Sequence, residues 1–169
     1  MNSIAVIGPE STGKSTLASA LADYFGTRCV PEYAREFLGK LDRPYNQDDL
    51  LTIAKGQLED EKAFRKQAND LIILDTDLFV IKVWSEFKYG NADPFLLQLL
   101  SMNQADLYLL TSPDIPFEDD PLRESPKDRA RLFDIYHKEL MNAGVNFQIV
   151  DGSHESRLQK SIMVINDLI

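Results

Sequence analysis

The sequence predicts an α/β domain with a five-stranded parallel sheet covered by helices on both faces. Three observations support this fold class. Short apolar runs alternate with longer segments of helical periodicity along the 169 residues, which is typical of strands joined by right-handed helical crossovers. The run 71–74 is apolar at every position, as expected of a strand buried on both faces. Polar residues follow the expected strands, at the sheet edge where such folds bind ligands.

The expected strands are apolar runs that end at a glycine, a proline or a polar residue. They cover residues 3–7, 27–30, 71–74, 107–110 and 145–150. The positions that follow them are residues 8–15, Glu32, Asp75, Asp77, 112–126, Asp151 and Gly152. Because the carboxyl ends of parallel strands meet at one edge, we expect several of these residues to share a site.

Apolar residues three or four positions apart mark the helices. The expected helical segments lie around residues 17–25, 33–38, 50–64, 78–102, 126–143 and 158–169. Gly39 and Gly144 follow two of these segments, so we expect them to end those helices. We expect one or two helices in the segment 78–102, which is interrupted near Gly90 and Pro94. Ser125 as N-cap and Pro126 at the first helical position predict the start of the fifth segment.

Charge and composition exclude several classes of function. The chain has 27 acidic and 18 basic residues and a net charge of −9. A protein that binds duplex nucleic acid or an anionic membrane needs a basic face, so neither partner is expected. Cys29 is the single cysteine, which excludes an internal disulfide and a cysteine-based zinc site. No long apolar run and no targeting segment is found. We therefore expect one soluble, cytoplasmic domain over residues 1–169.

Residues 8–15 match the phosphate-loop pattern G-x-x-x-x-G-K-S/T in full. The motif follows an apolar strand and opens an amphipathic helix, so its context supports it over an ordinary glycine-rich turn. Backbone amides and the helix N-terminus would surround the phosphates of ATP. Lys14 would reach the β- and γ-phosphates, and Ser15 would bind Mg²⁺. The residues expected to bind the nucleotide here are Gly8, Glu10, Ser11, Thr12, Gly13, Lys14, Ser15 and Thr16.

Two acidic residues follow the third strand. Asp75 comes after four apolar residues, which is the Walker-B arrangement that holds Mg²⁺ directly or through water. Outside such a context, an aspartate after a strand is usually a turn or capping residue. Asp77 either caps the next helix or binds a substrate hydroxyl, and the sequence leaves both roles open.

Among proteins with a phosphate loop, small-molecule kinases fit this chain best. Guanine recognition is set aside because residues 103–106 resemble N-K-x-D without its lysine and precede their strand. An AAA+ motor is set aside because it needs a further helical domain. A small-molecule kinase has a mobile lid whose arginines stabilise the transferring phosphoryl group. We expect this lid at about residues 112–127, with Arg123 in it and Arg129 or Arg131 just after it, unless these arginines are solvated helix charges.

Four segments carry more specific information than the phosphate loop alone. They are GPESTGKSTL at 8–17, PEYAREFL at 31–38, LDTD at 74–77 and PDIPFEDDPLR at 113–123. Together they resemble the ribosylnicotinamide kinase domain of NadR-type NAD-salvage proteins. The resemblance extends from Ile4 to about Arg157. The second and fourth segments are much more specific to that group than the first.

This resemblance implies a P-loop kinase fold with strand order 2-3-1-4-5. It implies transfer of the ATP γ-phosphate to the 5′-hydroxyl of nicotinamide riboside, giving nicotinamide mononucleotide. It also places adenine near residues 151–156, with Gly152 in the nucleotide site and Arg157 nearby. Bifunctional members of the family carry an adenylyltransferase domain, and sometimes a DNA-binding domain, ahead of the kinase. We expect neither domain, and neither activity, in this chain.

Nicotinamide riboside carries a cationic pyridinium ring, which favours aromatic faces and nearby carboxylates. Trp84, which is the only tryptophan, Tyr89 and Tyr33 are the aromatic candidates for contact with this ring. Most aromatic residues on helices belong to the core, and that interpretation is kept for Phe79 and Phe87. The residues expected on the substrate side are Tyr33, Arg35, Asp77, Trp84 and Tyr89.

A carboxylate is expected to orient the acceptor hydroxyl and to accept its proton during in-line transfer. Because Asp75 is assigned to the metal, Glu32 and Asp77 remain for this role. Glu32 is preferred because it ends the strand that flanks the acceptor side, and Asp77 is the alternative. Lys14 and Arg123 complete the expected catalytic set.

Two other functions remain open from the sequence. The chain could be a kinase for another nucleoside or small metabolite, or a nucleotide-binding module that hydrolyses ATP slowly without an acceptor. The lid arginines and Glu32 favour a kinase, since a switch module needs no acceptor site. Neither the oligomeric state nor the choice between ATP and GTP follows from the sequence.

Overall fold

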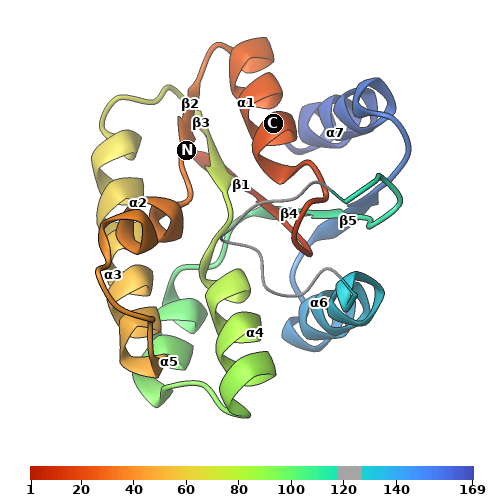
Figure 1. Cartoon of the computed structure of the whole chain (residues 1–169). Helices are drawn as coiled ribbons and strands as arrows, with labels where there is room; N and C mark the ends of the chain where they lie inside the picture. Colours follow the sequence, from red (N-terminus) through yellow and green to blue (C-terminus); the bar gives the residue numbers. More distant parts are fainter. Residues whose placement is uncertain (118–126) are drawn as a thin grey trace.

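The strands form one parallel sheet at the centre of the molecule (Figure 1). The computed structural model describes residues 1–117 and 127–169. The sheet order is β2-β3-β1-β4-β5, and every neighbouring pair is parallel. The strands are β1 (Asn2–Ile7), β2 (Arg28–Val30), β3 (Leu71–Asp75), β4 (Leu107–Thr111) and β5 (Phe147–Val150). The α/β class, the parallel sheet and the strand order expected above are therefore confirmed.

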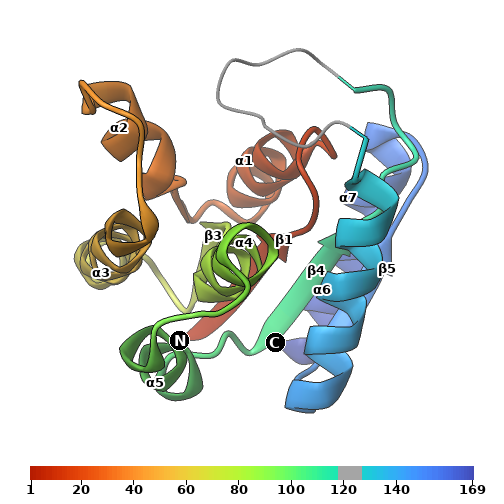
Figure 2. The same cartoon turned by 60° about the horizontal axis from the view of Figure 1, so that its bottom comes forward.

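Seven helices in the described residues pack against the two faces of this sheet. Helices α1 (Lys14–Phe25) and α7 (His154–Leu168) cover one face, and the other helices lie on the opposite face. These are α2 (Tyr33–Lys40), α3 (Gln47–Arg65), α4 (Leu78–Tyr89), α5 (Pro94–Met102) and α6 (Arg129–Ala143). Figure 2 shows α3, α4 and α6 side by side over this second face. The result is the three-layer sandwich expected from the sequence.

Each face of the sheet contributes to a separate core. Ile4 and Val6 of β1 pack with residues of α1 and α7, whereas Ala5 and Ile7 pack with residues of α3, α4 and α6. Successive residues of a strand point to opposite faces, which accounts for this division. Strand β3 is buried at all five of its positions. Its continuous apolar sequence follows from this burial.

Two expected helix boundaries are wrong. Helix α2 continues through Gly39 to Lys40, because Gly39 does not adopt the left-handed backbone with which glycine ends a helix. Gly144 does adopt it, at φ 65°, and ends α6 as expected. Helix α6 begins at Arg129, later than expected, and Leu132 N–H donates its first helical hydrogen bond to Asp128 O at 2.8 Å. Ser125 and Pro126 lie outside the described residues.

The segment 78–102 forms two helices. Gly90 ends α4 with a left-handed backbone at φ 80°, and Pro94 occupies the first turn of α5.

Among the described residues, no helix has both the length and the apolar character needed to cross a membrane.

Candidate active site

The phosphate loop, residues 8–15, connects β1 to α1 and packs tightly against β4. Gly8 has φ 143°, and a Cβ atom on it would lie 2.5 Å from the Thr111 hydroxyl oxygen. Gly13 has φ 77°, and a Cβ atom there would lie 3.2 Å from the His154 ring. Both glycines of the motif are therefore required by close packing as well as by backbone conformation.

Side chains of the loop help to fix its shape. Thr12 is fully buried, and its hydroxyl bonds to Pro9 O at 2.7 Å and to the Thr111 hydroxyl at 2.6 Å. Lys14 Nζ donates to Pro9 O at 2.7 Å. The Thr12 side chain thus holds the loop against β4, and Lys14 lies on the side of the loop that lines the cavity described below.

Arg157 connects the phosphate loop to two further loops. Its side chain is only 1% exposed. The guanidinium donates to Thr12 O at 2.5 Å, to Gly152 O at 2.9 Å and to Ser112 O at 2.9 Å. It also forms an ion pair with Asp114, whose other carboxylate oxygen accepts from Gly152 N at 2.6 Å. The loops that follow β1, β4 and β5 are therefore held together by one buried cation.

The arginines expected near the lid have different positions. Arg129 Nη2 donates to Ser11 O at 3.0 Å and to Ile115 O at 2.7 Å, so it bridges the phosphate loop and the segment after β4. Arg131 lies over an aromatic ring of α4. Arg123, and most of the lid expected at 112–127, lie outside the described residues.

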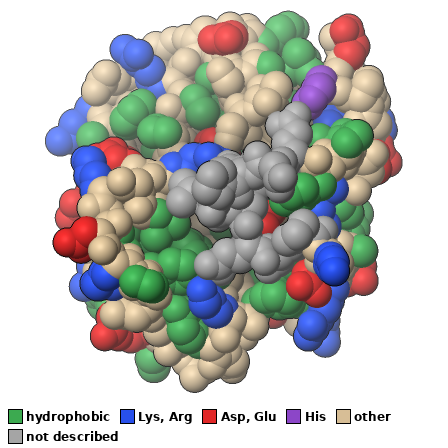
Figure 3. All heavy atoms as spheres, viewed as in Figure 1, with side chains coloured by type: hydrophobic (Ala, Val, Ile, Leu, Met, Phe, Trp, Pro, Cys, Tyr) green, Lys and Arg blue, Asp and Glu red, His purple; other side chains and the backbone are tan. Residues whose placement is uncertain are grey.

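A cavity of about 420 Å³ adjoins the phosphate loop. It is lined by residues 8–16, by the start of α2, by one face of α4 and by parts of α6 and α7. Glu32, Arg35 and Trp84 line it, as expected for a site that contacts substrate. Phe87 lines it too, so its assignment to the core alone is wrong. In Figure 3, hydrophobic and basic side chains lie next to one another over α4.

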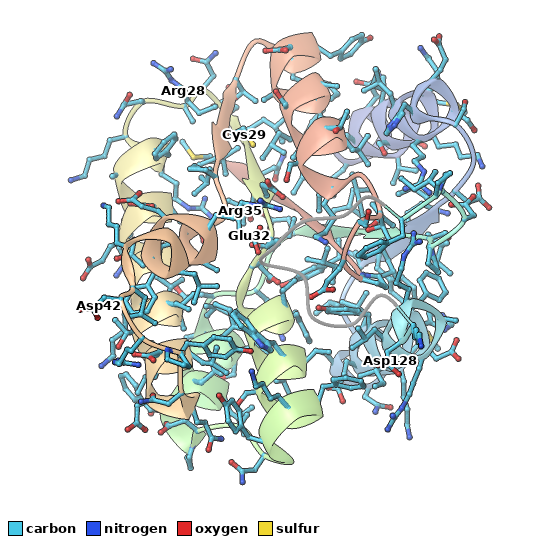
Figure 4. The ribbon with its side chains drawn as sticks, in the orientation of Figure 1. Arg28, Cys29, Glu32, Arg35, Asp42 and Asp128 are labelled. Carbon is cyan, nitrogen blue, oxygen red and sulfur yellow. The ribbon has the colours of Figure 1, made fainter. Side chains whose placement is uncertain are left out.

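Glu32 lies two residues after β2 and directly before α2, and its carboxylate accepts from Arg35 Nε at 3.2 Å. Figure 4 shows both residues at the inner end of α2, whereas Asp42 lies at the outer edge of the molecule. Burial raises the pKa of the Glu32 carboxyl, and the negative charge of Asp75 adds to this effect. The positive charges of Lys14 and Arg35 lower the same pKa. A carboxylate with a raised pKa beside a phosphate site is suited to accept a proton.

Asp75 and Asp77 are separated by an unusual backbone conformation. In an extended strand, residues two apart point to the same face. Thr76 between them has φ 72°, a left-handed value that is rare for a β-branched residue. Asp75 stays at the end of β3, where burial raises the pKa of its carboxyl, although the nearby Ser15 hydroxyl and the positive charge of Lys14 lower it in part. Asp77 turns into the core and does not line the cavity.

Asp77 is the N-cap of α4. Its Oδ1 accepts from Phe79 N at 2.9 Å. Burial raises the pKa of Asp77 to about 7. Of the two roles that the sequence left open for this residue, the capping role is confirmed, and its position in the core gives no access to a substrate in the cavity.

Trp84 belongs to an aromatic cluster that includes a residue missed by the sequence analysis. Its Nε1 donates to the Tyr45 hydroxyl at 2.9 Å, and the two rings meet edge to face at 4.9 Å. Lys88 Nζ lies 3.9 Å from the centre of the Tyr45 ring and also donates to its hydroxyl. Tyr45 comes from the loop between α2 and α3, which has no motif, so only the fold brings it to Trp84.

The other aromatic candidates are not in the cavity. Tyr33 packs over Gly56 of α3, where a Cβ atom would lie 2.2 Å from its ring. Tyr89 does not line the cavity either, and its ring faces Lys88. Phe79 is buried against Tyr108, as expected of a core residue. Gly152 does not line the cavity, because both of its backbone groups bond to the Arg157–Asp114 pair.

The residues expected to hold Mg²⁺ fit that ion. Ser15 is close enough to Asp75 to lower the pKa of its carboxyl, and the buried Oδ1 of Asp75 has no hydrogen-bond partner in the described part of the chain. A carboxylate and a hydroxyl are ligands that Mg²⁺ accepts, with waters and phosphate oxygens completing its shell. The described residues contain no group of three or more acidic, histidine or cysteine side chains that could hold a metal.

Comparison with known proteins agrees with this geometry. The family model described as an AAA domain matches residues 3–157, from β1 to the start of α7. The chain belongs to this AAA domain family. The match covers the nucleotide-binding domain itself, which contains the phosphate loop, Asp75 and Arg157.

A curated relative of this AAA domain protein is the trifunctional NAD biosynthesis/regulator protein NadR of Escherichia coli strain K12. It is 26% identical over 176 residues, which cover 100% of this chain and 43% of NadR. The chain therefore spans less than half the length of this relative. The resemblance to NadR inferred from four sequence segments is confirmed.

Solved structures share the fold of this AAA domain. The NadR protein in complex with NR has a TM-score of 0.83 at 22% identity, covering 98% of this chain and 51% of that one. NadR in complex with NAD and AMP-PNP has a TM-score of 0.82 at 21% identity, covering 98% and 49%. Thymidylate kinase from Ehrlichia chaffeensis has a TM-score of 0.72 at 15% identity, covering 97% and 98%. The chain thus has the fold of P-loop kinases.

Proposed function

We propose that the chain transfers the γ-phosphate of ATP to the 5′-hydroxyl of nicotinamide riboside, giving nicotinamide mononucleotide. The observation that carries this proposal is the single cavity onto which the phosphate loop, the Glu32–Arg35 pair and Trp84 all face. Direct transfer requires a donor site and an acceptor site that adjoin. A module that only hydrolyses ATP needs no acceptor wall, so the cavity favours a kinase.

The donor side of the proposal rests on the phosphate loop. Residues 8–16 line the cavity, and Lys14 there would contact the β- and γ-phosphates. Arg129 would keep the loop and the segment after β4 in register, and Arg123 of the lid would meet the phosphoryl group. Adenine would lie near the loop that follows β5, which contains Gly152. The NadR structure with AMP-PNP supports ATP as the nucleotide.

Ser15 and Asp75 would hold Mg²⁺ in this proposal. When bound, the ion neutralises negative charge on the phosphates and so makes the γ-phosphate easier to attack. Burial of Asp75 favours this role, because an ionised carboxylate without a nearby cation is costly in a buried position.

Glu32 is the proposed general base. Its carboxylate faces the cavity beside the phosphate loop, and its pKa is raised by burial. It would accept a hydrogen bond from the 5′-hydroxyl, direct that hydroxyl at the γ-phosphate and take its proton. Arg35 would hold the Glu32 carboxylate in position through the bond between them. Asp77 is no longer proposed for this role, because it is buried as a helix cap.

The acceptor side of the proposal rests on Trp84. Its ring lines the cavity and is held by the hydrogen bond to Tyr45, so it presents a fixed aromatic face. A cationic pyridinium ring binds favourably to such a face. Tyr33 and Tyr89 are no longer proposed as ring contacts, since neither lines the cavity. The solved NadR complex with NR supports the same class of acceptor.

A panel of acceptors tests this proposal. The protein is mixed with ATP, Mg²⁺ and one of nicotinamide riboside, deoxyadenosine, thymidine monophosphate or no acceptor, and ADP release is measured together with the mass of the product. We expect ADP release and a product heavier by one phosphoryl group with nicotinamide riboside. Transfer only to another acceptor, or ADP release independent of every acceptor, contradicts the proposal.

We also propose that this reaction takes place in the cytoplasm.

A further inference from the structure

The turn that carries Glu32 lacks an ordinary helix cap. Helix α2 begins at Tyr33, and Glu32 occupies the N-cap position, but its side chain makes no capping hydrogen bond. The first N–H groups of a helix have no partner within the helix, so another group must accept from them. The Glu32 carboxylate is directed to Arg35 and the cavity instead. The first N–H of α2 takes its partner from outside the helix.

Gln57 of α3 supplies that partner. Its side chain is buried, with 3% of the residue exposed. Tyr33 N–H donates to Gln57 Oε1 at 2.9 Å, and Gln57 Nε2 donates to Pro31 O at 3.2 Å. One side-chain amide therefore bonds to the residue before Glu32 and to the residue after it. Only a group with both a donor and an acceptor can match this turn, which offers one N–H and one carbonyl.

Close packing brings Gln57 within reach of the turn. Gly56 precedes it, and a Cβ atom on Gly56 would lie 2.2 Å from the Tyr33 ring. The absence of a side chain at this position lets α3 approach the start of α2. Gly56 and Gln57 together therefore fix the start of α2 against α3, and Glu32 has no part in that contact.

We propose that Gln57 is a positioning residue that holds the Glu32 turn, so that the Glu32 carboxylate faces the acceptor. This inference rests on the proposed role of Glu32 as base. Without the Gln57 amide, Tyr33 N–H and Pro31 O would both lose their partner, and the turn between them, which carries Glu32, would no longer be held against α3.

A double-mutant cycle tests the inference. Gln57→Met keeps the length and shape of the side chain but removes both hydrogen bonds. We expect kcat to fall about tenfold or more while KM for ATP stays unchanged, because a misplaced base affects transfer and not nucleotide binding. The double variant Gln57→Met/Glu32→Gln should be no slower than Glu32→Gln alone, since both changes remove one function.

The matched control is Gln47→Met. This residue lies on the same helix and also joins two elements, donating to Asn91 Oδ1 at 2.6 Å, but it is remote from the Glu32 turn. We expect its kcat to equal that of the unchanged protein. Hydrogen exchange gives a second measurement that does not depend on an enzyme assay. The Tyr33 amide should exchange slowly with deuterium in the unchanged protein and faster in Gln57→Met.

The outcomes separate this inference from the proposed function. If Glu32→Gln loses turnover but Gln57→Met keeps it, or if their losses multiply, the inference is wrong and the proposed function stands. If Glu32→Gln turns over normally, the assignment of the base is wrong and the inference falls with it. If no riboside is phosphorylated, the proposed function is wrong, and an unprotected Tyr33 amide would then overturn the hydrogen bond to Gln57 as well.

Discussion

The guanidinium of Arg157, on α7, donates a 2.5 Å hydrogen bond to the backbone carbonyl of Thr12 in the phosphate loop. The same side chain bonds to Gly152, Ser112 and Asp114, so the geometry of the nucleotide site depends on a residue at the far end of the sequence.

Arg157→Lys tests this dependence. Lysine keeps the charge but cannot reach all four partners with its single ammonium group. We expect the free energy of unfolding to fall by about 2 kcal/mol, since hydrogen bonds to a buried charge are lost. We also expect weaker binding of AMP-PNP. Urea denaturation and calorimetry measure the two effects. Unchanged nucleotide affinity would show that the loop keeps its shape without Arg157.

Lys14→Ala should abolish transfer without unfolding the domain. Lys14 lines the cavity and donates to Pro9 O within the phosphate loop, so its side chain faces the site and not the core. Loss of a cation that stabilises transferring charge should lower kcat by about a hundredfold or more. Turnover and the denaturation midpoint are compared with those of Lys138→Ala, an exposed lysine on α6. A folded Lys14→Ala protein with full activity would refute this role.

Glu32 should give the reaction an acid limb. The base acts only when ionised, and burial raises its pKa, so kcat should fall as the pH falls through that raised value. The limb should therefore lie above the ordinary range of a glutamate. Glu32→Gln should lower kcat strongly, leave ATP affinity nearly unchanged and remove the limb. Rates measured between pH 5 and pH 8 check this, and an identical limb in Glu32→Gln would assign it to another group.

Asp77 should make the protein less stable as the pH rises. Its folded pKa is about 7, above its value in the unfolded chain, so the native state binds a proton more tightly. The free energy of unfolding should therefore fall as the pH rises from about 4 to about 7, and then level off. Asp77→Asn keeps an acceptor for Phe79 N and should flatten this dependence. Urea denaturation at several pH values compares the two proteins.

The activity of Asp77→Asn adds a second check. A cap outside the cavity has no part in transfer, so kcat should be unchanged. If Asp77→Asn loses turnover while Glu32→Gln keeps it, the assignment of the base is reversed.

Trp84→Ala should raise KM for the riboside about tenfold and leave KM for ATP unchanged, because the ring offers its face to a cationic acceptor. Trp84→Phe keeps an aromatic face and loses only the bond to Tyr45, so its effect should be smaller. Initial rates with each substrate varied in turn measure this. Equal effects on both KM values would indicate a general loss of structure.

The sequence predicts those features that depend on local pattern. The alternation of apolar runs with helical segments predicts the strands and helices, and residues 8–15 predict the phosphate loop, because neighbours along the chain determine both. Asp75 is predictable for the same reason, as it ends a strand beside that loop. The strand order came from family resemblance and not from any local pattern.

Contacts between distant segments could not be predicted from local pattern. Tyr45 reaches Trp84 from a loop with no motif, and Gln57 bonds to Tyr33 across two helices. Tyr33 is an aromatic residue that could contact a substrate ring. However, Gly56 has no side chain, so the Tyr33 ring packs against α3 instead. Only the packing of α2, α3 and α4 decides which of these aromatic residues meet the cavity.

Because Thr76 has a left-handed backbone, the two aspartates of the D-x-D pattern lie in different environments. Two aspartates in this spacing after a buried strand invite assignment as one pair with a shared purpose. Here a single dihedral angle directs Asp75 to Ser15 and Asp77 to the amide of Phe79. Removing the Asp75 carboxylate should change the rate of transfer, and removing the Asp77 carboxylate should change the free energy of unfolding. A motif search that treats the two aspartates as equivalent would give the helix cap Asp77 the role that is proposed for Asp75.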